Sequence, residues 1–311
     1  MPLETPIAFC IFNRPKLTLQ VFDRIRTAKP KQLFVVADGA REDRPNEAIL
    51  VQQTRAVVDR VDWDCEVKTN FAERNLGCKQ RIATGLDWAF EQSEELIILE
   101  DDCLPAVSFF GYCEKLLERY RDQPRVMMIS GDNFQPKPRS ENSYYFSRWP
   151  HIWGWASWRR AWNHFDADVK TWPETKSTGQ LRATFGSDEE YQYWSDTLDQ
   201  QHAGNIDTWD FSWSYACWRM GGLCILPERN LVTNLGFGPS ATHTTDSNSE
   251  LANLLTTEVG ELIHPAKIAP NRIADQHTWE NVLAPKQDTV GAIESPKKAK
   301  WYHRFTRKQA G

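Results

Sequence analysis

Three consecutive carboxylates, Glu100, Asp101 and Asp102, form the strongest candidate for a chemical site in this sequence. They follow the apolar run 96–99, which has the pattern of a strand buried on both faces. Adjacent carboxylates repel one another, and a hard cation such as Mn²⁺ or Mg²⁺ relieves that repulsion. The structural alternative is that the acids favour the N-terminus of a following helix, expected to begin near Pro105. Both interpretations stay open on the local sequence.

A second pair of acids, Asp207 and Asp210, lies in a Trp-rich segment late in the chain. Residues 211–220 have helical spacing, and Asp210 precedes them in the position of an N-cap. The same position suits a general base held at a helix N-terminus. The segment alone favours the capping aspartate, with the catalytic base as the alternative.

Tryptophan is unusually frequent: the chain has 14, and ten of them fall between Trp149 and Trp218. Such a concentration indicates either a very aromatic core or a surface that stacks on a flat ligand. The CH face of a sugar ring stacks on indole while its hydroxyls stay hydrogen-bonded. We expect most of these side chains in the core and one or two beside a sugar, with Trp155, Trp153 and Trp209 as the candidates.

The composition is that of an ordinary globular protein, with 311 residues, 41% hydrophobic and 25% charged. A net charge of −5 argues against a nucleic-acid partner. The seven cysteines are scattered without a Cys-x-x-Cys spacing, which argues against a zinc module or a disulfide framework. The N-terminus lacks the basic region of a signal peptide, so we expect a cytoplasmic location.

The elements that must position these acids alternate between strand and helix over the first 125 residues. Strands are predicted at 7–12, 33–37, 65–69 and 96–99, with helices between them, the first capped by Asn13 and the second running through 49–61. Such alternation implies a parallel sheet covered by helices, whose ligands bind outside the carboxyl ends of the strands. The other polar residues at those ends are Asn13, Arg14, Asp38, Arg74 and Asn75.

The second half of the chain is harder to assign. Strands are predicted at 126–129 and 223–226, a loop or hairpin at 135–143, and a flexible segment at 236–249. The sequence has no glycine-rich phosphate loop, which disfavours a P-loop NTPase and a Rossmann dehydrogenase. A bound diphosphate would therefore be held by a metal and by basic residues.

Taken together, these motifs resemble glycosyltransferases of the GT-A fold. Within that fold the chain is most similar to the N-acetylglucosaminyltransferase I group and to bacterial family 2-like enzymes. The similarity covers about residues 5–245. The motifs, in order, are Phe9-Cys10-Ile11-Phe12-Asn13-Arg14, Val36-Ala37-Asp38-Gly39, the helix 81–90, Leu99-Glu100-Asp101-Asp102, Phe109-Phe110, Gly154-Trp155, Trp209-Asp210, Pro227-Glu228, Gly236-Phe237-Gly238 and His243.

The resemblance implies an α/β fold with a mainly parallel central sheet flanked by helices. It implies a GT-A domain over 1–245, with a nucleotide-binding half at 1–125 and an acceptor half at 126–245. Residues 246–311 would form a C-terminal extension with a basic tail.

The resemblance also implies roles for individual residues. The nucleoside would contact Arg14 and Asp38, with Asn13 beside them, and Asp101 would face the sugar or ribose. The metal would be held by Asp102, with Glu100 and His243 as further candidates. The charge of the diphosphate would be neutralised by Arg14, Arg74 or Lys79. The donor sugar and the acceptor would lie beside Trp155, and Asp210 would be the catalytic base.

We therefore predict a metal-dependent, inverting glycosyltransferase that moves a hexose or N-acetylhexosamine from a nucleotide-diphosphate sugar to a glycan or glycolipid hydroxyl. A UDP-sugar is the favoured donor and Mn²⁺ or Mg²⁺ the cofactor. The segment Trp209-Asp210-Phe211-Ser212-Trp213 departs from the family pattern, which leaves the base between Asp210 and Asp207. The alternatives are a non-catalytic glycan-binding protein and a glycoside hydrolase, but a hydrolase leaves Arg14 and Asp38 without a role.

The segment 297–308 carries six basic residues and no acid. Such a tail can bind weakly to an anionic membrane surface, here the inner face of the membrane. A solvated terminus is the alternative.

Overall fold

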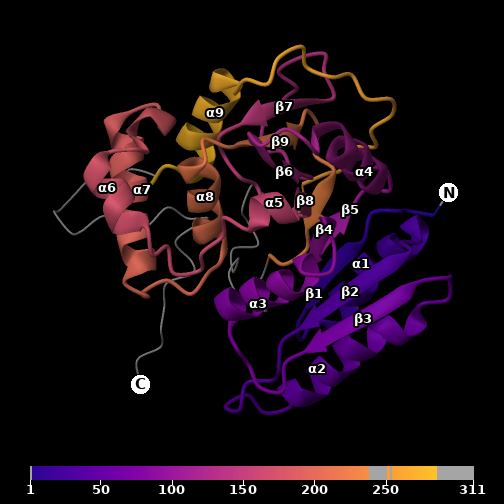
Figure 1. Ribbon diagram of the computed structural model, residues 1–311. Helices are drawn as coiled ribbons and strands as arrows, with labels where there is room; N and C mark the ends of the chain where they lie inside the picture. The colour runs from indigo at the N-terminus through magenta and orange to yellow at the C-terminus, as the bar shows by residue number, and fades with distance from the viewer. Residues whose placement is uncertain (1, 238–250, 253, 286–311) are drawn as a thin grey trace.

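The computed structural model describes residues 2–237, 251, 252 and 254–285, and its centre is an eight-stranded sheet (Figure 1). The strand order is β3-β2-β1-β4-β8-β6-β9-β7. In chain order, the strands of this sheet are β1 (Ile7–Ile11), β2 (Gln32–Ala37), β3 (Glu66–Phe71), β4 (Glu95–Glu100), β6 (Val126–Ser130), β7 (Tyr144–Ser147), β8 (Trp155–Trp158) and β9 (Leu223–Pro227). A separate antiparallel pair is made by β5 (Cys103–Pro105) and β10 (Val232–Asn234).

The first four strands of the chain are parallel. The chain runs from β1 through β2 to β3 in one direction, and β4 then pairs with the other side of β1. The strand order therefore reverses between β1 and β4, which is where ligands bind in open α/β sheets. The carboxyl ends of these two strands place the segment after Ile11 beside the acids that begin at Glu100.

Helices cover both faces of the sheet, because successive side chains of β1 point to opposite faces and all of them are buried. Ile7 and Phe9 pack with α1 (Pro15–Ala28) and α4 (Ser108–Tyr120) on one face. Ala8 and Cys10 pack with α3 (Cys78–Phe90) and α8 (Asp210–Arg219) on the other. The predicted α/β class, with a mainly parallel sheet flanked by helices, is confirmed.

The tryptophan-rich stretch contributes to the sheet and to a helical layer beside it. β8 inserts antiparallel between β4 and β6, while β9 runs parallel to β6 and β7 closes the edge. Figure 1 shows α6 (Trp172–Thr178) and α7 (Asp188–His202) gathered with α8 on one side of the sheet. All ten tryptophans between Trp149 and Trp218 are buried, so the aromatic core is the explanation for their number.

Three helix boundaries differ from the sequence predictions. Arg14, not Asn13, precedes α1, because the Asn13 amide donates to Glu47 Oε1 at 2.8 Å. The helix expected near Pro105 begins at Ser108, since Pro105 itself belongs to β5, which pairs with β10. Asp210 is the first residue of α8 rather than its N-cap, which is Trp209.

The helix predicted through 49–61 is divided into α2 (Glu47–Arg55) and a 3₁₀ turn, η1 (Ala56–Arg60). Ile49 and Leu50 lie on its solvent side, whereas Val57 and Val58 are buried against α1. The remaining short helices are α5 (Arg159–Trp162), η2 (Arg182–Thr184), α9 (Arg272–Thr278) and the π-helical turn η3 (Trp279–Leu283). Within the described residues, no helix is long and apolar enough to cross a membrane.

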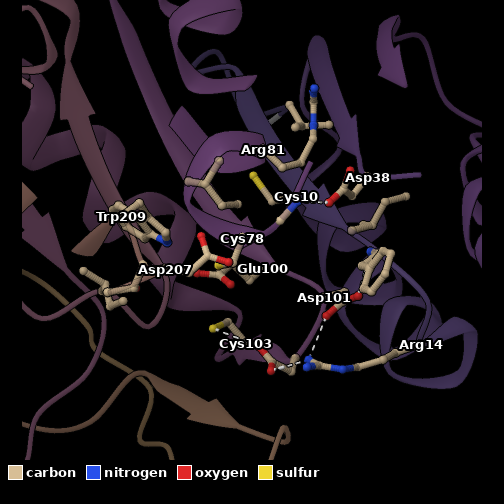
Figure 2. Close-up of a pocket in the computed structure, with 18 of the residues that line it drawn as sticks. Cys10, Arg14, Asp38, Cys78, Arg81, Glu100, Asp101, Cys103, Asp207 and Trp209 are labelled. Atoms are coloured by element: carbon tan, nitrogen blue, oxygen red, sulfur yellow. Dashed lines mark hydrogen bonds and ion pairs between the residues drawn. The ribbon is translucent and has the colours of Figure 1, made fainter. Parts of the chain in front are cut away.

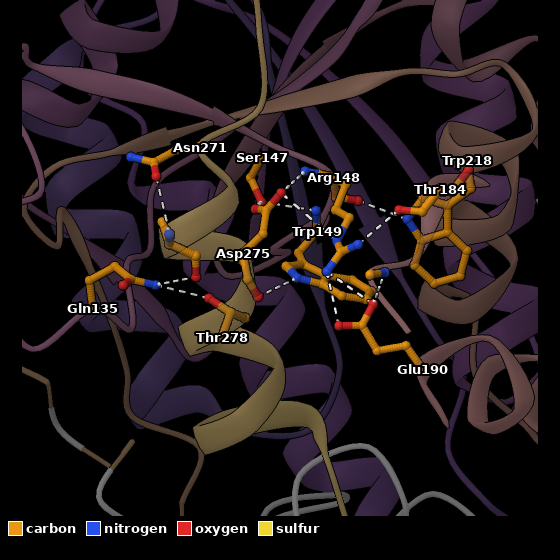
Figure 3. A network of polar contacts seen from close by, with 12 residues as sticks. Gln135, Ser147, Arg148, Trp149, Thr184, Glu190, Trp218, Asn271, Asp275 and Thr278 are labelled. Atoms are coloured by element: carbon orange, nitrogen blue, oxygen red, sulfur yellow. Dashed lines mark hydrogen bonds and ion pairs between the residues drawn. The ribbon is translucent and has the colours of Figure 1, made fainter. Parts of the chain in front are cut away.

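Helix α9 is attached to the sheet by a buried polar network (Figure 3). The carboxyl of Asp275 accepts the Ser147 hydroxyl at 2.6 Å and the Arg148 backbone N–H at 3.3 Å. The Arg148 guanidinium lies between this carboxyl and Glu190, to which Nη2 donates at 3.0 Å. The Trp149 indole donates to the Asp275 carbonyl at 2.9 Å. Residues distant in the sequence therefore hold α9 against β7.

Replacing Asp275 with Asn should remove a pH dependence from the stability of the protein. Burial raises the pKa of Asp275 to about 6, although Ser147 and Arg148 lower it. The folded state thus holds this proton more tightly than the unfolded chain, so the free energy of unfolding falls as the pH rises from about 4 to 6. The stability difference between wild type and Asp275→Asn should shift by roughly 1–3 kcal/mol over that range in chemical denaturation.

The matched control is Asp43→Asn, because the Asp43 side chain is 77% exposed. This variant should track the wild type at every pH. A stability difference between wild type and Asp275→Asn that stays constant between pH 4 and 7 would contradict the prediction.

Candidate active site

A cavity of about 340 Å³ lies at the carboxyl ends of β1, β2 and β4 (Figure 2). Its walls come from the segments that follow these strands, from the first turn of α3, and from two segments of the second half, 152–153 and 207–209. The charged residues that line it are Arg14, Asp38, Arg41, Arg81, Glu100, Asp101, Asp102 and Asp207. The fold thus brings the three consecutive acids and Asp207 to one cavity.

Arg14 is the counter-ion of two of the three consecutive carboxylates. Its Nη1 lies 2.6 Å from Asp102 Oδ2 and 3.1 Å from Asp101 Oδ1 (Figure 2). Asp101 Oδ2 also accepts the Phe12 backbone N–H at 3.0 Å, which ties the end of β4 to the end of β1. One guanidinium therefore orders the turn that follows β4.

The acids raise one another's proton affinity. Burial raises the pKa of Glu100, and the charges of Asp102 and Asp101 raise it further. Burial also raises the pKa of Asp101, whereas Arg14 lowers it. Glu100, whose pKa is raised to about 8, therefore holds its proton near neutral pH, and a further cation at the end of β4 would favour its ionised form.

Asp38 organises the loop before α3. Its Oδ1 accepts the backbone N–H groups of Gly39 at 2.8 Å and Leu76 at 2.9 Å. Its Oδ2 accepts the Asn75 amide at 3.0 Å and the Gly77 N–H at 3.1 Å. Burial raises the pKa of this carboxyl, while these N–H groups lower it. Asp38 borders the cavity, with four hydrogen bonds already made to the protein.

Two arginines that the sequence analysis did not single out line the cavity beside Asp38. Arg81 is 6% exposed, and its Nη2 donates to Asn70 Oδ1 at 2.8 Å. The Arg41 guanidinium pairs with Glu47, whose Oε2 also accepts the Arg41 backbone N–H at 2.7 Å. The sequence did contain a signal for Arg81, because this charged residue lies on the same helical face as the small residues Gly85 and Ala89, which is expected to pack on the sheet.

Among the other cavity residues, Cys10, Cys78, Thr208 and Asn234 were missed. Asn234 lies two residues before Gly236, so proximity to that motif was its only sequence signal. Trp153 and Trp209, which were candidates for the sugar site besides Trp155, do line the cavity.

Several predicted binding residues do not line the cavity. Arg74 is exposed, and Lys79 pairs with Asp168, with 3.0 Å between Nζ and Oδ1. Asn13 faces Glu47 instead. Trp155 is 1% exposed in β8, stacked on Trp209 with 5.6 Å between the ring centroids. His243 lies outside the described residues.

The two candidate bases occupy different positions. Asp207 is exposed and lines the cavity, where Figure 2 shows it beside Glu100. A Cβ built on Gly77 would lie 3.1 Å from Asp207 Oδ2, so the loop before α3 passes close to this carboxyl. Asp210 is 3% exposed and does not line the cavity. Its carboxyl accepts a hydrogen bond from the hydroxyl of Thr208, a residue that does line the cavity. Burial raises the pKa of Asp210 to about 6.

No protein-family model matches the chain, and no curated protein matches it either. Similar solved structures include a mannosyltransferase from Pyrobaculum calidifontis in complex with GDP-Man and Mn²⁺, at 16% identity and a TM-score of 0.35. This similarity covers 50% of the chain, which spans 45% of the length of that protein.

Two further solved structures are similar. A UDP-glucose pyrophosphorylase complexed with UDP-glucose has 9% identity and a TM-score of 0.36, over 72% of this chain and 90% of that one. A 4-diphosphocytidyl-2C-methyl-D-erythritol synthase from Anaerococcus prevotii has 10% identity and a TM-score of 0.31, over 50% of this chain and 72% of that one. At these identities, the similarities concern the general fold.

Proposed function

We propose that this protein is an inverting glycosyltransferase that takes its sugar from a nucleotide-diphosphate donor, with a UDP-sugar favoured. The observation that carries the proposal is the cavity at the reversal of strand order, where Arg14, three successive carboxylates and the 207–210 segment meet. A nucleotide sugar needs polar groups for the nucleoside, positive charge for the diphosphate and a base near the sugar, and each class is represented there. The motif resemblance to GT-A enzymes supports the same assignment.

The lining residues suggest how a donor would lie. The nucleoside would face Asp38, Arg81 and Arg41, at the ends of β2 and α3. The diphosphate would lie toward Arg14 and Asp102, and the sugar toward Glu100 and Asp207. In this arrangement the donor would contact none of Arg74, Lys79 and Trp155, which do not line the cavity.

The residues at the end of β4 fit a divalent cation that is bound together with a diphosphate. No group of three or more His, Cys, Asp or Glu side chains among the described residues is arranged to hold a metal alone. Mg²⁺ and similar ions are commonly held by one or two carboxylates, with substrate phosphates and water as further ligands. Asp102 would be that carboxylate, with Glu100 beside it. When bound, the metal would supply positive charge against the leaving diphosphate.

The reaction would be a single in-line displacement. An acceptor hydroxyl loses its proton to a carboxylate of the 207–210 segment and forms a bond to the anomeric carbon. The bond from that carbon to the diphosphate oxygen breaks on the opposite side, and Arg14 lies where it can hold the departing oxygens. The acceptor is a hydroxyl of a glycan or glycolipid.

A nucleotide-sugar panel tests the proposal directly. Purified protein is incubated with UDP-glucose, UDP-galactose, UDP-N-acetylglucosamine or GDP-mannose, with Mn²⁺ or EDTA, and melting temperature and nucleoside diphosphate release are measured. Stabilisation and release by at least one donor, stronger with Mn²⁺, are expected. Glycan binding with no response to any nucleotide would favour the glycan-binding alternative. Glycoside hydrolysis without a nucleotide would favour the hydrolase.

Replacing Gly236 with Ala should weaken metal-assisted nucleotide binding about tenfold, equivalent to about 1.4 kcal/mol. The backbone of Gly236 passes so close to Asp102 that a Cβ would overlap Oδ2 of that carboxylate and lie 2.9 Å from Asn234 Oδ1. Asp102 would therefore have to move. Calorimetric titration with UDP in the presence of Mn²⁺ measures the change.

The control for Gly236→Ala is Gly111→Ala in α4. A Cβ on Gly111 meets no atom within 4 Å, and alanine is a better helix former than glycine. This variant should bind UDP like the wild type. Equal affinities for UDP in the two variants would contradict the role given to the Gly236 backbone.

We also propose a cytoplasmic location with weak membrane contact through the basic tail, which lies outside the described residues. Removing residues 296–311 should lower co-sedimentation with vesicles containing phosphatidylserine, because each basic residue near an anionic surface contributes about 1 kcal/mol. Binding to neutral vesicles is the control. Identical partitioning of the full and shortened chains would end the proposal.

A further inference from the structure

Thr208 connects the cavity to a carboxyl behind it. Thr208 is one of the residues that line the cavity, and its hydroxyl donates to Asp210 Oδ1. Asp210 itself is 3% exposed and is not among the residues that line the cavity. The hydrogen bond from Thr208 therefore links a residue of the cavity wall to the Asp210 carboxyl.

The segment around this hydrogen bond is held from several sides. Gln201 Nε2 donates to the Thr208 carbonyl at 2.9 Å and to the Ser212 hydroxyl at 2.8 Å. The Asp210 carboxyl also interacts with backbone N–H groups at the start of α8, its own and that of Phe211. The hydroxyl and the carboxyl are thus ordered before any ligand binds, as proton transfer requires.

Asp207 offers a different environment. It is exposed, and no hydrogen bond to its carboxyl is found among the described residues. Nothing in that part of the chain fixes its orientation toward a reacting hydroxyl. The buried carboxyl is the better oriented of the two acids, although only the exposed one borders the cavity.

We propose that Thr208 relays the acceptor proton to Asp210, an inference that rests on the proposed glycosyl transfer. The acceptor O–H bond breaks and its proton passes to Thr208 Oγ1. The proton that Thr208 already carries passes along the existing hydrogen bond to Asp210 Oδ1. Thr208 is unchanged overall, Asp210 ends protonated, and the electron pair left on the acceptor oxygen forms the bond to the anomeric carbon.

The relay predicts a specific ranking of variants. Thr208→Val keeps the shape of the side chain but removes the hydroxyl, so kcat should fall about a hundredfold or more while KM for the donor changes little. Thr208→Ser restores a hydroxyl and should recover most of the activity. The double variant Thr208→Val/Asp210→Asn should have a kcat no lower than that of Asp210→Asn alone, because both substitutions interrupt the same proton path.

The matched control is Thr197→Val in α7. Thr197 is also buried, and its hydroxyl donates to the Tyr193 carbonyl at 2.9 Å. This variant should keep the wild-type kcat. Rates are measured as nucleoside diphosphate release with the best donor of the panel described above, and melting temperatures confirm that each variant is folded.

A proton inventory separates a relay from a purely structural role. Single-turnover rates in mixtures of H₂O and D₂O should depend on deuterium content along a curve in wild type and Thr208→Ser, because two protons move together. A linear dependence in the wild type would overturn the relay. So would full activity in Thr208→Val, or a large loss of kcat in Asp207→Asn with none in Asp210→Asn. Absence of release by the wild type with any donor would instead overturn the proposed function itself.

Discussion

Asp102→Ala is expected to lower the rate of nucleoside diphosphate release about 10²- to 10³-fold. Asp102 is the carboxylate at the end of β4 closest to Arg14, with 2.6 Å between Oδ2 and Nη1, and its side chain is 13% exposed in the cavity. Removing it takes away the proposed protein ligand of the divalent cation and leaves Arg14 paired with Asp101 alone. Both the loss of the cation and the changed pairing of Arg14 should weaken the electrostatic stabilisation of the leaving diphosphate.

The control for Asp102→Ala is Asp62→Ala. Asp62 also pairs with an arginine, Arg26, but both side chains are about half exposed and lie outside the cavity. Its removal should leave the rate unchanged. Release is measured with saturating donor and Mn²⁺, and Mn²⁺-dependent UDP binding is measured in parallel. An Asp102→Ala protein with the wild-type rate would remove this residue from the mechanism.

Trp155→Ala is expected to destabilise the fold by about 3–5 kcal/mol, the usual cost of truncating a buried aromatic side chain. Trp155 stacks on Trp209 and contacts Trp213, with 5.6 Å between ring centroids in each pair. Its neighbours on the same face of the sheet come from α3, α5 and α8. A cavity there would separate these helices from the sheet.

Trp155→Phe distinguishes a core role from sugar stacking. Within the described residues the Trp155 indole N–H has no hydrogen-bond partner, so phenylalanine loses volume but no polar contact. This variant should lose less stability than Trp155→Ala and keep the KM for the donor. The free energy of unfolding is measured by urea titration. An increase in donor KM of tenfold or more in Trp155→Phe, with stability unchanged, would return Trp155 to the sugar site.

The sequence predicted best where local pattern and structure coincide. The apolar runs of β1, β2 and β4 are continuous because strands in the middle of a parallel sheet are buried on both faces. Polar residues at the carboxyl ends of such parallel strands must meet at one edge of the sheet. The sequence alone could therefore assign Arg14, Asp38 and the acids 100–102 to one site.

The second half of the chain was less predictable because its contacts are long-range. The Trp-rich pattern around Trp155 has no period, and β8 forms only because β4 and β6 offer two antiparallel edges. The position of helix α9 depends on hydrogen bonds from Ser147 and Arg148 to Asp275, and these partners lie more than 120 residues earlier in the chain. No local signal specifies such partners.

The sequence by itself determined the α/β class, with its parallel first half, and the place where charge collects. These follow from hydrophobic periodicity and from the geometry of parallel strands, which act over a few residues. Only the tertiary structure decided which side chains reach the cavity. It buried Trp155 and Asp210, left Asp207 exposed, and brought Thr208 and Arg81 to the wall, because burial and hydrogen bonding depend on neighbours that the chain supplies from elsewhere.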